Sequence, residues 1–172
     1  AFETPTNQDD NYGVRTRSFL QVPVTGQYTF WIASDDNGQL LLSTDTNPEN
    51  ASLIAEVTGW TSSQQWDKFS SQQSAVFDLV AGESYYIEAL MKEGGGGDNL
   101  AIGWSSPQLG LLEPTVIAND NLRVFSADID APVVVNESGI AIEGGSLTLS
   151  PAELSVRDAD SQSYLHVYTI TS

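Results

Sequence analysis

The sequence predicts an all-β protein, a two-sheet antiparallel β-sandwich with a short β-rich C-terminal extension. The first observation is that short alternating runs rich in aromatic and β-branched residues recur along the chain. The second is that turn signals such as Thr25-Gly26 and Ala81-Gly82 separate these runs. The third is that no long stretch has the periodicity of a helix. Many short strands with regular turns are typical of two aligned sheets that bury alternate residues between them.

Six runs are expected to be strands of this sandwich. Residues 28–33 alternate, with Tyr28, Phe30 and Ile32 on one face. Residues 85–91 have the strongest strand character, and residues 100–104 alternate again. The other runs are shorter and apolar, at residues 40–42, 53–55 and 75–79.

The sequence pattern of the chain changes near Phe125. We expect a sandwich domain over residues 1–125 and a polar, proline-containing linker over residues 126–132. Residues 133–172 again read as strands and turns. About 40 residues are too few to bury an independent core without help, so this part is expected to be an incomplete repeat or an extension.

The composition limits the partners. Asp and Glu number 23 against six Lys and Arg, which gives a formal net charge of −17. Such a surface repels phosphate backbones and anionic lipid, so we expect no nucleic acid partner and no insertion into a membrane. It attracts cations. The absence of cysteine excludes disulfides and thiolate metal sites, and a cysteine-free acidic β-rich chain is typical of bacterial surface proteins.

Two distant loops carry carboxylates next to expected strand ends. Asp35 and Asp36 follow the strand at 28–33, and Asp98 lies in a glycine-rich loop that starts at Gly94. Calcium takes about 6–8 oxygen ligands from carboxylates, carbonyls and water. Neighbouring strand residues point to opposite faces, so the two aspartates converge only with an unusual backbone, such as a cis peptide bond between them. Glycine allows carbonyls to turn inward without a side-chain clash.

The same residues also permit a simpler interpretation. Asn37-Gly38 is a strong two-residue hairpin signal, and Asp35 and Asp36 would then be polar residues that enter a turn. With 23 acidic residues, an adjacent pair arises easily by chance. The residue pattern alone leaves both interpretations open.

A family resemblance favours calcium. The segment from Tyr12-Gly13-Val14-Arg15 to Leu40 contains Gly26-x-Tyr28-x-Phe30 and then Ser34-Asp35-Asp36-x-Gly38. It resembles the protective-antigen-type lectin domain, a β-sandwich family found in yeast flocculins, fungal adhesins, some glycosidases and large bacterial adhesins. The later run from Gly82 through the glycine-rich loop to Trp104 is also similar, so the resemblance covers roughly residues 2–125.

The resemblance implies a binding site. Asp35 and Asp36 would be the family's calcium-binding aspartate pair, usually joined by a cis peptide bond, and Asp98 would be the ligand from the second loop. Carbonyl groups of Gly96 and Leu100 would complete the shell. Calcium is the expected cofactor, and in lectin members the ion takes two vicinal hydroxyls of a sugar, so Asp35, Asp36 and Asp98 belong to the sugar site as well.

Residues around the ion are expected to select the sugar. The polar candidates are Asn37, Gln39, Asn99 and Gln64, whose amides both donate and accept hydrogen bonds. Trp60 and Trp66 are candidates for stacking on a pyranose ring, although core packing is the more common role of a tryptophan.

The C-terminal part has a weaker resemblance. Val135 to Ile170 is similar to the opening of a cadherin-like or proteoglycan-type repeat of bacterial surface proteins, on residues 143–146, on the alternating acids Asp158 and Asp160 and on the closing strand at 168–170. Acidic residues at such junctions often bind calcium, and the candidates here are Asp128, Asp130, Glu143, Asp158 and Asp160.

We therefore expect a calcium-dependent lectin module of an extracellular bacterial surface adhesin, monomeric as a module, whose partners are cell-surface glycans with vicinal hydroxyls. No enzyme activity is expected, since the single histidine, His166, supports no catalytic triad. Two alternatives stay open. One is a calcium-rigidified structural or protein-contact module without sugar binding, and the other is an accessory module of a glycoside hydrolase.

Overall fold

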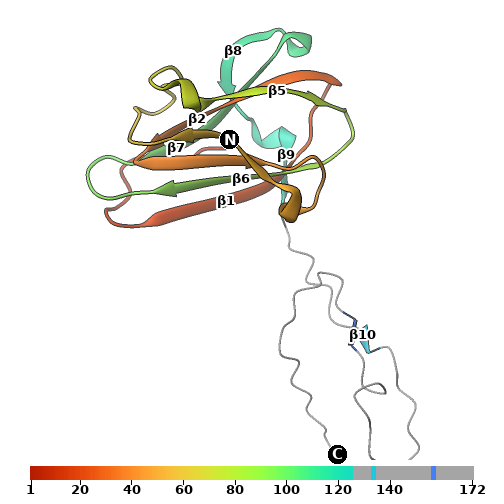
Figure 1. Ribbon diagram of the computed structural model, residues 1–172, viewed down its shortest axis with the longest axis horizontal. Coiled ribbons are helices and arrows are strands. Elements are labelled where there is room, and N and C mark those ends of the chain that lie inside the picture. Colours follow the sequence, from red (N-terminus) through yellow and green to blue (C-terminus); the bar gives the residue numbers. More distant parts are fainter. Residues whose placement is uncertain (126–132, 135–155, 158–172) are drawn as a thin grey trace, which may run out of the picture. The chain divides into compact units, whose positions relative to one another are not determined.

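Two antiparallel sheets face each other in residues 1–125, as the sequence predicts (Figure 1). One sheet has five strands in the order β4-β3-β6-β1-β9, and the other has four in the order β5-β2-β7-β8. The computed structural model describes residues 1–125, 133–134 and 156–157. The chain divides into two compact units, Ala1–Phe125 and Ser126–Ser172.

The strands of the first unit are β1 (Gly13–Leu20), β2 (Gly26–Asp35), β3 (Asn37–Leu42), β4 (Ser52–Val57), β5 (Gln73–Leu79), β6 (Tyr85–Lys92), β7 (Asn99–Ser106), β8 (Leu111–Val116) and β9 (Leu122–Val124). Four short 3-10 helices lie between them: η1 (Pro48–Asn50), η2 (Ser70–Gln72), η3 (Pro107–Leu109) and η4 (Asn119–Asn121). All six expected strands are present. Strands β1, β8 and β9 were not expected, because half of β1 is polar, β8 contains a proline and β9 has only three residues.

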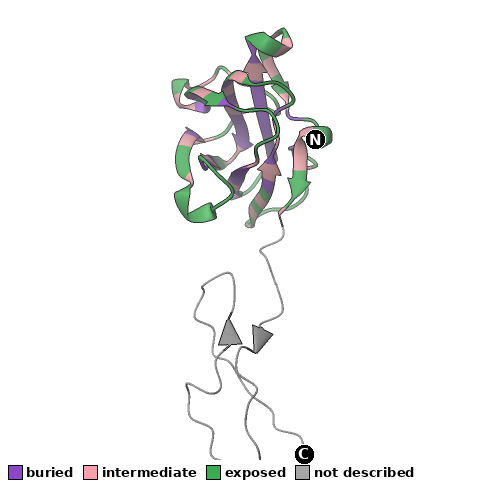
Figure 2. Cartoon of the chain, turned by 90° about the vertical axis from the view of Figure 1, so that its right-hand side faces the viewer, coloured by how far each residue is buried: buried purple, intermediate pink, exposed green. Residues whose placement is uncertain are grey.

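The core lies between the two sheets. Tyr28, Phe30 and Ile32 are fully buried on the inner face of β2, which confirms the predicted alternation. Leu100, Ile102 and Trp104 bury the inner face of β7, and the Trp104 ring lies 5.2 Å from that of Tyr28. Figure 2 shows this buried layer between exposed outer surfaces.

The hairpin interpretation of Asn37-Gly38 is wrong. Strand β2 ends at Asp35 in the four-stranded sheet, and β3 begins at Asn37 in the five-stranded sheet. The chain therefore crosses from one sheet to the other at Asp36. Gly38 is buried, and a Cβ there would lie 2.5 Å from Ser34 Oγ, so close approach of the two strands requires this glycine.

In the second unit, Val133–Val134 (β10) pairs antiparallel with Val156–Arg157 (β11). The predicted linker at 126–132 and most of the predicted repeat at 133–172, with its candidate calcium ligands, lie outside the described residues. Among the described residues, no helix is long and apolar enough to span a membrane.

Candidate metal centre

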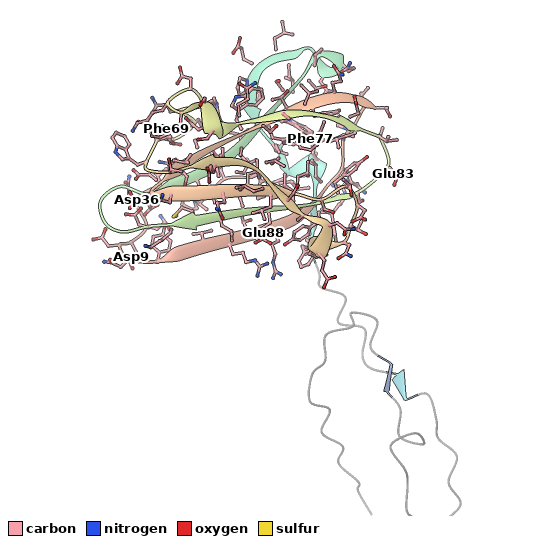
Figure 3. The ribbon with its side chains drawn as sticks, viewed as in Figure 1. Asp9, Asp36, Phe69, Phe77, Glu83 and Glu88 are labelled. Atoms are coloured by element: carbon pink, nitrogen blue, oxygen red, sulfur yellow. The ribbon has the colours of Figure 1, made fainter. Side chains whose placement is uncertain are left out.

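Asp35 and Asp36 lie at one end of the sandwich, where the chain passes between the sheets. The peptide bond that joins them is cis, as expected for a pair whose side chains converge. Both residues are half-buried, and Asp36 Oδ2 accepts a hydrogen bond of 2.9 Å from the Gly94 N–H. The glycine-rich loop, distant in sequence, is thus in contact with the aspartate pair. Figure 3 shows Asp36 at the same end of the sandwich as Asp9 and at the opposite end from Glu83.

A third carboxylate, Glu93, completes a cluster that the sequence analysis missed. It directly follows β6 and precedes Gly94, and it is 1% exposed. Carboxylate oxygens of Asp35, Asp36 and Glu93 lie within 4.8 Å of one another. An acid placed immediately before a glycine-rich loop was the available signal, but only the pairing of β3 with β6 brings this position beside Asp36.

Asp98 lies beside this cluster and faces the N-terminal arm, residues 7–12. Its Oδ2 accepts hydrogen bonds from the backbone N–H groups of Gln8 and Asp9. The arm also meets the glycine-rich loop, because Asn11 N–H donates to the Gly94 carbonyl over 3.1 Å. The arm therefore forms one side of the centre, and nothing in its local sequence predicts this position.

The electrostatics favour a cation. Burial, and then the charge of Asp36, raise the pKa of Asp35, whereas Lys68 opposes the shift. Burial, and then the charges of Asp36 and Asp35, raise the pKa of Glu93. Desolvation and repulsion between carboxylates both disfavour the ionised forms, and a positive ion among these oxygens would relieve both effects.

Unpartnered oxygens test whether a hard cation fits. In the part of the chain that the structure describes, the buried side-chain atoms without a hydrogen-bond partner are six oxygens, on Tyr12, Ser34, Glu93, Asp98 and Asn99. Ser34 and Asn99 are chain neighbours of Asp35 and Asp98, and the Tyr12 carbonyl accepts from Glu93 N–H. All six therefore gather at one end of the sandwich. Buried polar atoms are normally satisfied, and oxygen-only donor sets suit calcium, so the residues fit this ion.

The two expected carbonyl ligands differ in their surroundings. Gly96 has a φ of +122°, which favours glycine, and its N–H donates to Asp10 Oδ1 over 3.0 Å. The Leu100 carbonyl already accepts a hydrogen bond of 2.9 Å from Thr4 N–H. Asn99, expected near the sugar, is buried, and its Nδ2 donates to the Thr61 carbonyl. This hydrogen bond attaches the start of the loop that follows Trp60 to β7.

Three of the residues expected to select the sugar lie near Asp35 and Asp36. Trp60 is 53% exposed and forms a backbone bridge with Asp35. The Lys68 ammonium lies 3.1 Å from the centre of the Trp60 ring and donates to the Trp60 carbonyl. Asn37 and Gln39 are exposed on β3, directly after Asp36.

Gln64 and Trp66 lie elsewhere. Both line a groove on the outer face of the four-stranded sheet. Trp66 packs over Gly103, where a Cβ would lie 3.2 Å from its ring. Gln64 Nε2 donates to Glu3 Oε2 over 3.1 Å. The structure therefore brings Asp35 and Asp36 together with Glu93, Asp98 and Trp60, but it separates Trp66 from this group.

Two curated proteins from Mus musculus align with parts of this chain. The N-acetyl-beta-glucosaminyl-glycoprotein 4-beta-N-acetylgalactosaminyltransferase 1 is 41% identical over 99 residues, which cover 55% of this chain and 10% of that protein. Fibrocystin is 28% identical over 85 residues, which cover 45% of this chain and 2% of that protein. The alignments thus span a tenth or less of the length of these relatives.

Solved structures share the fold. An anti-sigma factor domain-containing protein from Clostridium clariflavum superposes with a TM-score of 0.51 at 25% identity, over 68% of this chain and 34% of that chain. The Epithelial Adhesin 6 A domain from Candida glabrata superposes with a TM-score of 0.52 at 15% identity, over 70% of this chain and 54% of that chain. The family model of the PA14 domain matches residues 2–116. This match covers more than half of the sequence, and the chain therefore belongs to the PA14 domain family.

Proposed function

We propose that this chain is a calcium-dependent carbohydrate-binding module of a cell-surface adhesin. The observation that carries the proposal is the convergence of Asp35, Asp36 and Glu93 to within 4.8 Å beside buried oxygens that lack partners. Like charges at that spacing in a partly buried site repel strongly. A site built in this way is completed by a cation.

Asp35, Asp36 and Asp98 would hold the calcium ion, with carbonyl groups of the glycine-rich loop around Gly96. Glu93 adds negative charge within 4.8 Å of the pair. Bound calcium supplies coordination positions that two vicinal hydroxyls of a sugar can take in place of water. The carboxylates of Asp36 and Asp98 would fix the position of the ion, because Gly94 N–H holds the first and the arm amides hold the second.

Exposed residues beside the pair would select the sugar. Trp60 offers an exposed indole next to Asp35, and Asn37 and Gln39 offer exposed amides on β3, directly after Asp36. The Lys68 ammonium over the Trp60 ring donates one hydrogen bond to the Trp60 carbonyl, and its two other N–H groups are donors for hydroxyl oxygens.

The comparisons support a sugar ligand. The similarly folded adhesin domain from Candida glabrata was solved in complex with Galb1-3GlcNAc. A small monosaccharide site offers few contacts, so we expect modest affinity from a monomeric module, which an adhesin on a bacterial surface would raise by avidity.

A glycan array, read with calcium and again with a chelator, tests the proposal. Glycans held through the ion are expected to bind with calcium and to be released by chelator. Asp36→Asn is expected to lose both calcium binding and this calcium-dependent sugar binding. Asp78→Asn is a matched control, since Asp78 lies on β5 away from the centre. Calcium binding without any glycan signal would instead favour a calcium-rigidified structural module. Unchanged calcium-dependent sugar binding by Asp36→Asn would contradict the proposal.

A second candidate has one observation in its favour. The mouse relative at 41% identity is named as a glycosyltransferase, and this chain matches only a tenth of it. The same fold could therefore serve as an accessory module attached to a glycan-modifying enzyme, either a transferase or a glycoside hydrolase. The sequence that flanks the domain in its full-length protein discriminates the two candidates.

A further inference from the structure

We propose that the outer face of the four-stranded sheet carries a second, metal-independent carbohydrate subsite. It is the groove of about 650 Å³ lined by Trp31, Trp66, Gln73 and residues of the loop 64–70 and of β8. Its ligand class is a neutral oligosaccharide. The inference goes beyond the calcium centre and does not depend on it.

Two tryptophans form the floor of this groove. In the sheet register, Trp31 of β2 is paired with Gln73 of β5 on one side and with Gly103 of β7 on the other. Paired residues of adjacent strands point to the same face. Trp66 packs over Gly103, so its indole lies next to Trp31 across the sheet. Neither indole belongs to the core, and both are half-buried.

The wall of the groove is tethered by a buried glutamine. Gln72 is fully buried, and its Nε2 donates to the carbonyls of Ile32, over 2.8 Å, and of Gln65, over 2.6 Å. Its Oε1 accepts from Phe69 N–H over 2.8 Å. The loop before η2 is therefore attached to β2, the strand that carries Trp31. A wall held in this way loses little conformational entropy when a ligand binds.

The chemistry of the lining selects the ligand. Indole faces pack against the apolar faces of pyranose rings, and Gln64, Gln65 and Gln73 supply amides that both donate and accept. The charged side chains among the lining residues are Asp67 and Glu113, which accept hydroxyl donors and repel anions. An uncharged polyhydroxylated chain therefore suits the groove better than a phosphorylated, sulfated or sialylated one.

The groove is separate from the metal centre. Trp31 and Asp35 lie on the same face of β2, four residues or about 13 Å apart along the strand. Between them lies Ala33, which is fully buried. A ligand in the groove would therefore meet no calcium ligand, which predicts binding that persists in chelator.

The experiment is a titration of the 1–172 protein with neutral trisaccharides (cellotriose, maltotriose and chitotriose) in EDTA, monitored through the four tryptophan indole N–H signals by NMR. At least one trisaccharide is expected to shift the signals of Trp31 and Trp66 and to leave those of Trp60 and Trp104 in place. Trp31→Ala and Trp66→Ala are each expected to weaken binding at least about tenfold.

Two sets of variants separate this subsite from the calcium site. Trp60→Ala and Asp36→Asn are expected to leave binding in EDTA unchanged. If Trp66→Ala fails to fold in a thermal melt, Gln73→Ala, which changes an exposed groove residue, replaces it and is expected to weaken binding. The proposal is overturned if no trisaccharide moves the two signals at concentrations up to about 10 mM. It is also overturned if Asp36→Asn abolishes the shifts. Loss of array binding in Asp36→Asn alone bears only on the calcium proposal.

Discussion

Glu88 and Glu93 are both buried glutamates of the β6 region, at 7% and 1% exposure, but their surroundings are opposite. Glu88 receives two hydrogen bonds from Arg15, of 3.0 and 2.9 Å, and a third from the Tyr86 hydroxyl. Neither carboxylate oxygen of Glu93 has a hydrogen-bond partner within 3.5 Å, and the Asp36 backbone N–H only partly opposes the rise of its pKa. Burial by itself would raise the pKa of Glu88, but Arg15 and Tyr86 outweigh it and lower that pKa. The pKa of Glu93 is raised.

The contrast between Glu88 and Glu93 distinguishes a carboxylate that stabilises the fold from one that is a candidate for ligand binding. A buried carboxylate that must stabilise the fold is given its counter-charge by the chain, as Arg15 does for Glu88. A buried carboxylate left beside two other acids costs stability. Proteins keep such destabilising arrangements at functional sites, where a ligand can offset them. Glu93 is therefore a better indicator of the candidate metal centre than the exposed acids of this highly charged chain.

The largest expected effect is that of calcium on stability. Calcium at 100 times its dissociation constant is expected to raise the free energy of unfolding by about 2.7 kcal/mol, because only the folded chain brings Asp35, Asp36 and Glu93 together. Urea denaturation with calcium and with EDTA measures the difference. Asp36→Asn is expected to abolish it, whereas Glu88→Gln is expected to retain it. Equal stability of the wild-type protein with calcium and with EDTA would contradict the proposal that Glu93, unlike Glu88, belongs to a calcium site.

The second effect is that two matched variants are expected to change the free energy of unfolding in EDTA in opposite directions. Glu88→Gln is expected to lower the free energy of unfolding by about 1–3 kcal/mol, since it weakens charge-assisted hydrogen bonds in a buried position. Glu93→Gln is expected to raise it, since it removes a buried charge that no cation balances. Thermal melts of both variants at pH 7 provide the measurement. Destabilisation by Glu93→Gln in EDTA would show that this side chain has a partner in the metal-free protein.

Tyr86→Phe tests the smaller part of the Glu88 network. Removal of the Tyr86 hydroxyl leaves both Arg15 hydrogen bonds in place, so a loss of about 1 kcal/mol is expected. Chemical denaturation, with or without calcium, should give the same loss, because Tyr86 is remote from the aspartate pair in the sheet register. A loss that depends on calcium would connect the two regions.

The smallest expected effect is on the pH dependence of stability in EDTA. Because the pKa of Glu93 is raised in the folded state, the folded chain keeps a proton that the unfolded chain has released. Stability from this group therefore falls as pH rises from the ordinary glutamate pKa, about 4.3, through the raised value. Glu88, with a lowered pKa, acts in the opposite sense, and its contribution is lost as pH falls. Denaturation curves from pH 4 to 8 are expected to be flatter for Glu93→Gln than for the wild-type protein.

Sequence patterns were sufficient for the sandwich and for part of the centre. Alternation and short apolar runs predicted six strands. An aspartate pair at a strand end and a glycine-rich loop, read through the family resemblance, identified the two segments that meet at Asp36 and Gly94. Those signals are local: a strand end and a glycine-rich turn are both visible in a few residues.

The missed parts depend on tertiary pairing. Glu93 lies in the cluster because β6 pairs with β3. Trp66 lies away from the aspartate pair because its indole packs over Gly103 of β7, which has no side chain. The Leu100 carbonyl is engaged by Thr4, from a segment with no strand pattern. Spacing along the chain carries no information on any of these contacts.

The N-terminal arm has a practical consequence for anyone who transplants this domain. A fragment trimmed to start at β1 would keep the strands of the sandwich, yet Asp98 would lose the two amides that orient it, and the core would lose Phe2, which is 4% exposed. The smallest portable unit therefore begins upstream of its first strand.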